Sequence, residues 1–137
     1  MMDDFLDTNV VLYAFGNDEF KRNIASNFLA LYPYISTQVI NECSHVMRRK
    51  LRWTPEKITE ELDVLLILVR LKTVDIHHIR LAWKLAGRYG FSHYDSLMVA
   101  SALAAGCKHL YSEDMQHGQI IENSLQIINP FLEKSGL

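Results

Sequence analysis

Short apolar runs alternate along the chain with longer segments in which apolar residues recur at the helical period. The short runs predict strands at residues 4–6, 34–36, 73–76, 109–111 and 125–128. The periodic segments predict helices at about residues 20–31, 38–51, 55–71, 78–89 and 94–105. Boundary residues support these helices: Thr37 and Thr54 are candidate N-caps, and Gly90 and Gly106 follow two of the expected ends.

This alternation of strands and helices indicates the fold class. Helical crossovers of ten or more residues join strands that run parallel, so the pattern predicts a three-layer α/β/α fold with a mostly parallel central sheet. No repeat, low-complexity tract or linker interrupts the pattern, and we expect one domain over residues 1–137. Working sites in such folds lie beyond the carboxyl ends of the strands, and candidate chemistry is therefore sought there.

Four acidic residues lie close to predicted strand ends or helix starts. Asp7 follows the first strand, and Glu42 lies in the helix after the second. Asp95 lies in the first turn of an apolar helix, and Asp114 follows the strand at 109–111. Apolar neighbours disfavour the charges of Asp7 and Asp95 unless a cation offsets the loss of hydration. Mg²⁺ prefers oxygen ligands, so the four acids predict a site for one or two such ions and metal-assisted hydrolysis of a phosphodiester.

Each of these carboxylates also has a structural explanation. The macrodipole of a helix favours an acid at the position of Asp95. Asp7 could cap the next helix, and Glu42 could lie on a solvated helix face. The sequence does not show that the four acids meet in space, so both interpretations stay open at this point.

Composition narrows the range of functions. The chain has 137 residues, of which 49% are hydrophobic and 22% charged, values typical of folded domains. Its net charge of −2 excludes a polybasic protein that holds nucleic acid by bulk charge alone. No segment is apolar enough to cross a membrane. Cys43 and Cys107 form neither a disulfide framework nor a zinc pattern, so we expect both thiols in the core of a cytoplasmic protein.

Three segments resemble, in family order, the motifs of the PIN-domain nucleases. The run Leu6-Asp7-Thr8-Asn9-Val10-Val11 is similar to the opening of these proteins, and Tyr94-Asp95-Ser96-Leu97-Met98-Val99 to their central acidic helix. The run Tyr111-Ser112-Glu113-Asp114, with Ile127-Ile128-Asn129-Pro130-Phe131 after it, is similar to their C-terminal acidic loop and closing strand. The resemblance covers essentially the whole chain, and the pattern is that of the VapC-type toxins of toxin–antitoxin pairs.

The resemblance implies a metal-dependent endoribonuclease that uses Mg²⁺ or Mn²⁺ and leaves 5′-phosphate and 3′-hydroxyl ends on RNA. Position by position, the family's acidic quartet matches Asp7, Glu42, Asp95 and Asp114. The motif favours Asp114 over its neighbour Glu113. Asp95 is expected to position or deprotonate the attacking water.

The resemblance also suggests supporting residues and partners. Thr8 and Asn9 are expected to orient Asp7 or a water in the site. A cognate antitoxin that covers the carboxylates with an arginine is the implied protein partner, and a homodimer is the implied assembly. The apolar run 64–69 exceeds what one helix face needs, so that helix is either buried on all sides or part of a protein interface.

The densest basic cluster follows Glu42 on the same predicted helix. It consists of Arg48, Arg49, Lys50 and Arg52. Two interpretations stay open: a phosphate-binding edge beside the metal site, or cations that the negative end of the helix stabilises.

Two alternative functions remain. The run Asp7-Thr8-Asn9 follows the first strand as the motif of a HAD-like phosphatase does, but Asn9 stands where that mechanism needs a second acid. A catalytically silent PIN-like module that binds RNA or protein is the other alternative, although such a module would have no need of all four acids.

Overall fold

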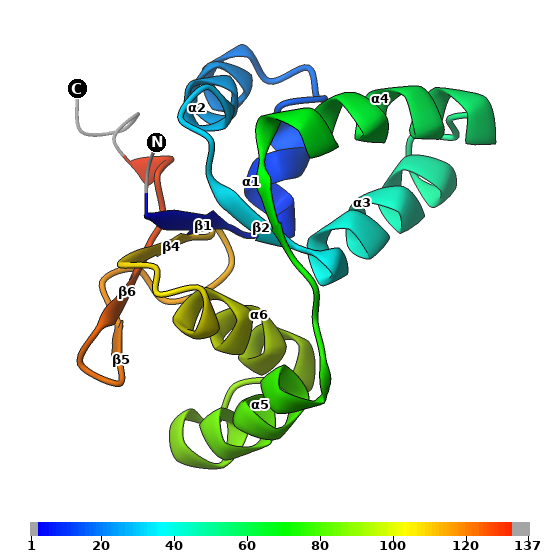
Figure 1. Ribbon diagram of the computed structural model, residues 1–137. Helices are drawn as coiled ribbons and strands as arrows, with labels where there is room; N and C mark the ends of the chain where they lie inside the picture. The colour runs from blue at the N-terminus through cyan, green and yellow to red at the C-terminus, as the bar shows by residue number, and fades with distance from the viewer. Residues whose placement is uncertain (1–2, 133–137) are drawn as a thin grey trace.

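The computed structural model describes residues 3–132 (Figure 1). The remainder of the expected domain, residues 1–2 and 133–137, lies outside the described residues. A six-stranded sheet in the order β3-β2-β1-β4-β6-β5 forms its centre. The strands are β1 (Asp4–Leu6), β2 (Tyr34–Ser36), β3 (Arg70–Lys72), β4 (His109–Tyr111), β5 (Ile120–Ile121) and β6 (Leu125–Ile128). Within residues 3–132, β5 alone pairs antiparallel, so the mostly parallel sheet is confirmed.

Helices cover both faces of this sheet. They are α1 (Thr8–Tyr13), α2 (Glu19–Leu29), α3 (Thr37–Arg49), α4 (Pro55–Leu68), α5 (Ile76–Tyr89) and α6 (His93–Ala104). Figure 1 shows α5 and α6 lying together on one side of the sheet, with α1 to α4 on the other. The predicted three-layer α/β/α arrangement is therefore confirmed. Because β1, β2 and β4 run parallel, their carboxyl ends meet at one edge of the sheet.

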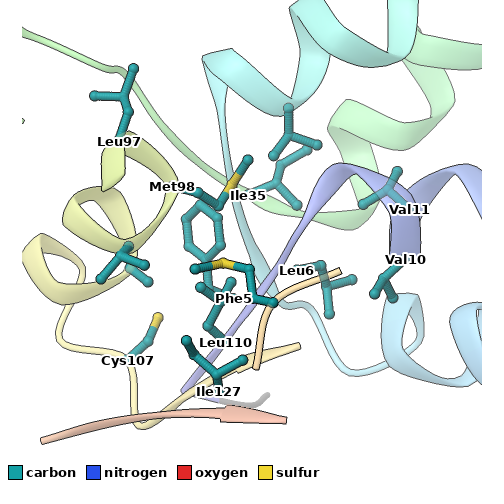
Figure 2. Close-up of a cluster of buried hydrophobic side chains, with 14 of the residues drawn as sticks. Phe5, Leu6, Val10, Val11, Ile35, Leu97, Met98, Cys107, Leu110 and Ile127 are labelled. Atoms are coloured by element: carbon teal, nitrogen blue, oxygen red, sulfur yellow. The ribbon is translucent and has the colours of Figure 1, made fainter. Parts of the chain in front are cut away.

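The central strands are held between the two helical layers by apolar side chains. Phe5, Leu110 and Ile127 are fully buried, and Figure 2 shows them between Met98 of α6 and Val11 of α1. Burying a side chain of this size contributes about 1.5–3 kcal/mol each. This burial fixes the positions of the strands and therefore of the residues at their ends.

Both cysteines are buried, as predicted. Burial raises the pKa of Cys43 to about 12, with the nearby charges of Glu42 and Asp7 adding to the effect. Burial likewise raises the pKa of Cys107 to about 12. Both thiols stay protonated at neutral pH and behave as small apolar side chains.

The strand expected at residues 73–76 is wrong. The strand is Arg70–Lys72, on the edge of the sheet, where half-exposed charged side chains are tolerated and give no apolar signal. The residues after it lead into α5, because the Asp75 carboxylate accepts hydrogen bonds from the N–H groups of His77 and His78. The expected helix start at 78 therefore moves to Ile76.

Three further boundaries differ from expectation. Ser36, not Thr37, is the N-cap of α3, since the Thr37 hydroxyl instead accepts a hydrogen bond from Val74 N–H at 3.1 Å. The six-residue α1 and the two-residue β5 are too short to leave a periodic signal in the sequence. The expected helix at 55–71 ends at Leu68, because the chain turns there into β3.

The apolar helix α4 is not buried on all sides. Val64 is 55% exposed and Ile67 is 77% exposed, while Leu62 and Leu65 face the core. Of the two interpretations that the sequence left open, full burial is wrong. No helix within residues 3–132 has the length and apolar character needed to span a membrane.

Candidate active site

Asp7 stands where the chain leaves β1 and turns into α1. Its carboxylate is the N-cap of α1 and accepts a hydrogen bond from Thr8 N–H at 2.7 Å. The hydroxyl of Ser112, directly after β4, donates to the other carboxylate oxygen at 2.7 Å. The capping role considered from the sequence is thus real, but it uses one oxygen only. The ends of β1 and β4 therefore fix one acid between them.

The first turn of α1 holds two of the other acids. The hydroxyl of Thr8 donates to Glu42 Oε1 at 2.6 Å, and the amide of Asn9 donates to Asp114 Oδ2 at 3.0 Å. Asn9 is itself fixed, because its side-chain oxygen accepts from Glu113 N–H at 3.2 Å. The side chains of Thr8 and Asn9 orient Glu42 and Asp114, whereas Asp7, which the sequence suggested together with a water, is contacted by the backbone N–H of Thr8.

Asp95 arrives from the opposite layer, in the first turn of α6. The hydroxyl of Ser92 caps this helix by accepting from Asp95 N–H at 3.2 Å. A second contact joins the layers: the Gln38 amide donates to Tyr94 O at 3.1 Å. These bonds fix the backbone around Asp95, while its carboxylate lies exposed at the surface.

All four acids line one cavity of about 540 Å³. The remaining lining residues are Thr8, Asn9, Leu12, Gln38, Asn41, His45, Val46, Tyr94 and Met98. The four acids come from four separate segments of the sequence, so the fold brings together the candidates that the sequence singled out.

The charges in this cavity act on one another. Burial raises the pKa of Asp7 from 3.8 to about 6, against the lowering effect of the hydrogen bonds from Ser112 and Thr8. The negative charges of Glu42 and Asp95 raise the same pKa further. Asp7 is only 8% exposed, so its ionised form lacks both water and a compensating cation within the described residues.

Glu113, the neighbour that competed with Asp114, takes part in a different set of contacts. It forms an ion pair with Lys21 and accepts a hydrogen bond from the hydroxyl of Tyr13. These contacts hold its pKa below the usual range of a glutamate. Glu113 does not line the acidic cavity, whereas Asp114 does.

The donor set suits a hydrated divalent cation. No three Asp, Glu, His or Cys side chains within residues 3–132 are grouped closely enough to ligate one ion together. Mg²⁺ usually keeps several waters and takes one or two carboxylates directly, so spaced carboxylates around a cavity fit it. The buried Gln38 side-chain oxygen has no hydrogen-bond partner in the described part of the chain and adds another oxygen beside the cavity.

Sequence reasoning missed Ser112 and Gln38. Ser112 stands within the motif that carries Asp114, but its contact with Asp7 depends on β1 and β4 pairing across about a hundred residues. Gln38 depends in the same way on the approach of α3 to α6. The expectation that sites lie beyond the carboxyl ends of the strands covers both residues, but it does not indicate which polar residues near a strand end take part in the site.

Comparisons with known proteins bear on the family and the fold. The family model described as PIN domain matches residues 5–121. No curated protein matches the chain significantly. Among solved structures, a toxin–antitoxin complex from Klebsiella pneumoniae is similar at a TM-score of 0.69 and 15% identity, covering 93% of this chain and 97% of that one.

Two more solved structures have the same fold. The Sarcin-Ricin loop cleaving toxin VapC20 of Mycobacterium tuberculosis has a TM-score of 0.64 and 18% identity, covering 81% of this chain and 89% of its own. VapBC2 of Rickettsia felis, bound to a DNA fragment from its promoter, has a TM-score of 0.65 and 21% identity, covering 94% and 100%.

Proposed function

The chain belongs to the PIN domain family, and from this premise we propose that it is a divalent-metal-dependent endoribonuclease, the toxin of a toxin–antitoxin pair. The observation that carries the proposal is the single cavity lined by Asp7, Glu42, Asp95 and Asp114. A site for one or two Mg²⁺ or Mn²⁺ ions accounts for four acids gathered at one place, which a purely structural explanation of each does not. We take residues 1–137 as one PIN-like nuclease domain acting in the cytoplasm.

Similar proteins support the choice of substrate and partner. VapC20 is a Sarcin-Ricin loop cleaving toxin, and three other similar structures are toxin–antitoxin or FitAB assemblies. Together with the sequence motifs, these likenesses favour RNA as the substrate and a cognate antitoxin as the protein partner.

In this function the four acids have different roles, which follow from their positions around the cavity. Glu42 and Asp114, oriented by Thr8 and Asn9, and the buried Asp7 would hold a hydrated ion, one or two of them directly and the rest through its waters. Asp95 extends from the opposite layer without a hydrogen bond to its carboxylate among residues 3–132, so it is free to position or deprotonate the attacking water. The bound ion supplies charge stabilisation and an acidified water.

A basic hollow beside the acidic cavity supports a polyanionic substrate. Arg48, Arg49 and Arg52 line a space of about 490 Å³. Arg49 follows Glu42 by seven residues on α3, so it lies on the same helix face about 10 Å further along the axis. Within residues 3–132 no acid pairs with these arginines, which leaves their charge available to phosphates. We therefore favour the phosphate-binding interpretation of this cluster.

The end of α3 is built to hold these arginines in place. Arg52 has a φ of 56°, a left-handed conformation that is uncommon for residues with a β-carbon. Two hydrogen bonds hold the turn: Trp53 N–H donates to Met47 O at 3.0 Å, and the guanidinium of Arg48 donates to Trp53 O at 3.1 Å.

The test is incubation of the purified chain with total RNA and Mg²⁺ or Mn²⁺, followed by mapping of the fragment ends. We expect cleavage with 5′-phosphate ends, loss of cleavage in EDTA and recovery when Mg²⁺ is added in excess. RNA binding without metal-dependent cleavage would favour the silent module. Hydrolysis of p-nitrophenyl phosphate instead of RNA would favour the phosphatase.

The exposed apolar face of α4 leads us to propose a homodimer. Val64, Ile67 and Leu68 project from this face beside a groove of about 330 Å³ that Leu65 and Phe15 also line. Light scattering on the purified chain is expected to give a mass near twice 15.8 kDa, and Ile67→Lys is expected to return it to the monomer. Because Ile67 is 77% exposed, the variant keeps its stability. A wild-type mass of a single chain would contradict the dimer.

A further inference from the structure

A second hollow lies against the same carboxylates. It has a volume of about 340 Å³ and shares Asp95 and Asp114 with the acidic cavity. The other residues lining it are Tyr89, Gly90, Phe91, Ser92, Met115, Gln116 and Gln119. A phosphate held at the acids would therefore have this hollow beside it.

One wall of the hollow is a fixed aromatic face. The rings of Tyr89 and Phe91 stack at 5.6 Å with an interplanar angle of 17°. Tyr89 is held in place because its hydroxyl donates to Glu122 Oε2 at 2.8 Å and accepts from Glu122 N–H at 2.9 Å. Gly90 makes the sharp turn between the two rings possible, with a φ of 75°. Phe91 is half-buried and is among the residues that line the hollow.

Two further residues in the lining carry amide side chains. Gln116 and Gln119 lie in the loop after Asp114, and their side chains have no hydrogen-bond partner within residues 3–132. Their backbone, however, is fixed. Gly118 N–H donates to Ile127 O at 2.7 Å, and Ile127 N–H donates to Gln119 O at 2.9 Å. The loop thus adds two uncommitted donor–acceptor groups to a hollow whose lining also includes two aromatic residues.

We propose that this hollow binds the base of the unpaired RNA nucleotide adjacent to the bond that is cut. The proposal rests on the proposed function and adds how that site selects its substrate. Unpaired bases are recognised by stacking on aromatic rings and by hydrogen bonds to their edges, and this hollow offers both. A stacked base must leave its own helix, so the site takes a single-stranded or looped RNA. The amides of Gln116 and Gln119 then distinguish the bases by their donor and acceptor patterns.

The test compares binding of four short fluorescent oligoribonucleotides, one for each base, in Mg²⁺. The parent carries Asp7→Asn, which blocks cleavage and leaves every residue lining the hollow unchanged. The pair Gln116→Ala and Gln119→Ala is expected to shrink the spread of the four dissociation constants by about tenfold. Phe91→Leu is expected to weaken binding of all four by about 5- to 100-fold. The pair Asn23→Ala and Asn27→Ala, two exposed amides on α2, is the matched control.

Several outcomes would overturn the inference. If Phe91→Leu and the pair Gln116→Ala and Gln119→Ala bind all four oligonucleotides as the parent does, the hollow does not bind a base. It would then bind another group, such as a side chain of a protein partner. A parent that binds none of the four would have the same consequence. Neither outcome touches the proposed function if the wild-type chain still cleaves RNA with Mg²⁺, so the two failures are distinguishable.

Discussion

Replacing Asp95 by asparagine is expected to lower the rate of RNA cleavage by about 100-fold or more and to leave the fold intact. Loss of a group that positions or deprotonates the attacking water typically costs about 10²- to 10⁴-fold. The structural cost is small because Asp95 is exposed, and the hydrogen bond that caps α6 uses its backbone N–H and the Ser92 hydroxyl. The macrodipole contribution lost is about 0.3–1 kcal/mol.

Single-turnover cleavage of a labelled RNA in Mg²⁺ measures the first effect, and urea denaturation measures the second. Asp63→Asn, an exposed acid on α4 outside the cavity, is the matched control and should cleave as the wild type does. An Asp95→Asn protein that cleaves at the parental rate would remove Asp95 from the active site and leave the proposed mechanism without its base.

The sequence alone pointed to four acids that the fold brings to one cavity, because the geometry of a parallel sheet constrains where strand-end residues lie. Asp7 follows β1 directly and Asp114 lies three residues after the end of β4, so the pairing of β1 with β4 brings them to the same edge. Glu42 and Asp95 were harder to place, since each lies on a helix whose rotation and approach depend on tertiary packing. Their position on the cavity follows from contacts such as that of Gln38 with Tyr94 O.

What the sequence missed has a common physical cause. The edge strand β3 carries Arg70 and Lys72, and a half-exposed edge gives no alternation of apolar and polar residues to recognise. The sequence predicts that Thr8 and Asn9 orient Asp7 or a water in the site, whereas their side chains reach Glu42 and Asp114, residues distant in sequence. Local spacing predicts local elements well, but hydrogen-bond partners across the sheet require its assembled geometry.

Replacing Asp7 by asparagine is expected to stabilise the metal-free protein at neutral pH. Burial and the charges of Glu42 and Asp95 raise the pKa of Asp7 to about 6, above its ordinary value of 3.8. A raised pKa means that the folded state binds the proton of Asp7 more tightly than the unfolded state does. The ionised carboxylate therefore lowers the free energy of unfolding once the pH exceeds the pKa of Asp7 in the unfolded chain. The cost is absent below about pH 4, grows between pH 4 and 6, and reaches about 3 kcal/mol above pH 6.

Asparagine removes this cost and keeps the local hydrogen bonds. Its side-chain oxygen can still accept from Thr8 N–H, and its amide can donate to the hydroxyl of Ser112, which reverses its role. Urea denaturation in EDTA should therefore show Asp7→Asn more stable than the wild type by up to about 3 kcal/mol at pH 8 and nearly equal to it at pH 3.5. Asp63→Asn should differ little from the wild type at either pH.

Adding Mg²⁺ at a thousand times its dissociation constant should reverse the order, because a cation that binds only the folded wild type then stabilises it by about 4.1 kcal/mol. Asp7→Asn should gain little from the same addition, since the substitution removes one of the carboxylates that attract the ion. A wild-type chain that is more stable than Asp7→Asn in EDTA at pH 8 would contradict the cost in stability assigned to the buried, ionised carboxylate of Asp7. A wild-type chain whose free energy of unfolding does not rise in Mg²⁺ would show instead that the four acids are not gathered to hold this cation.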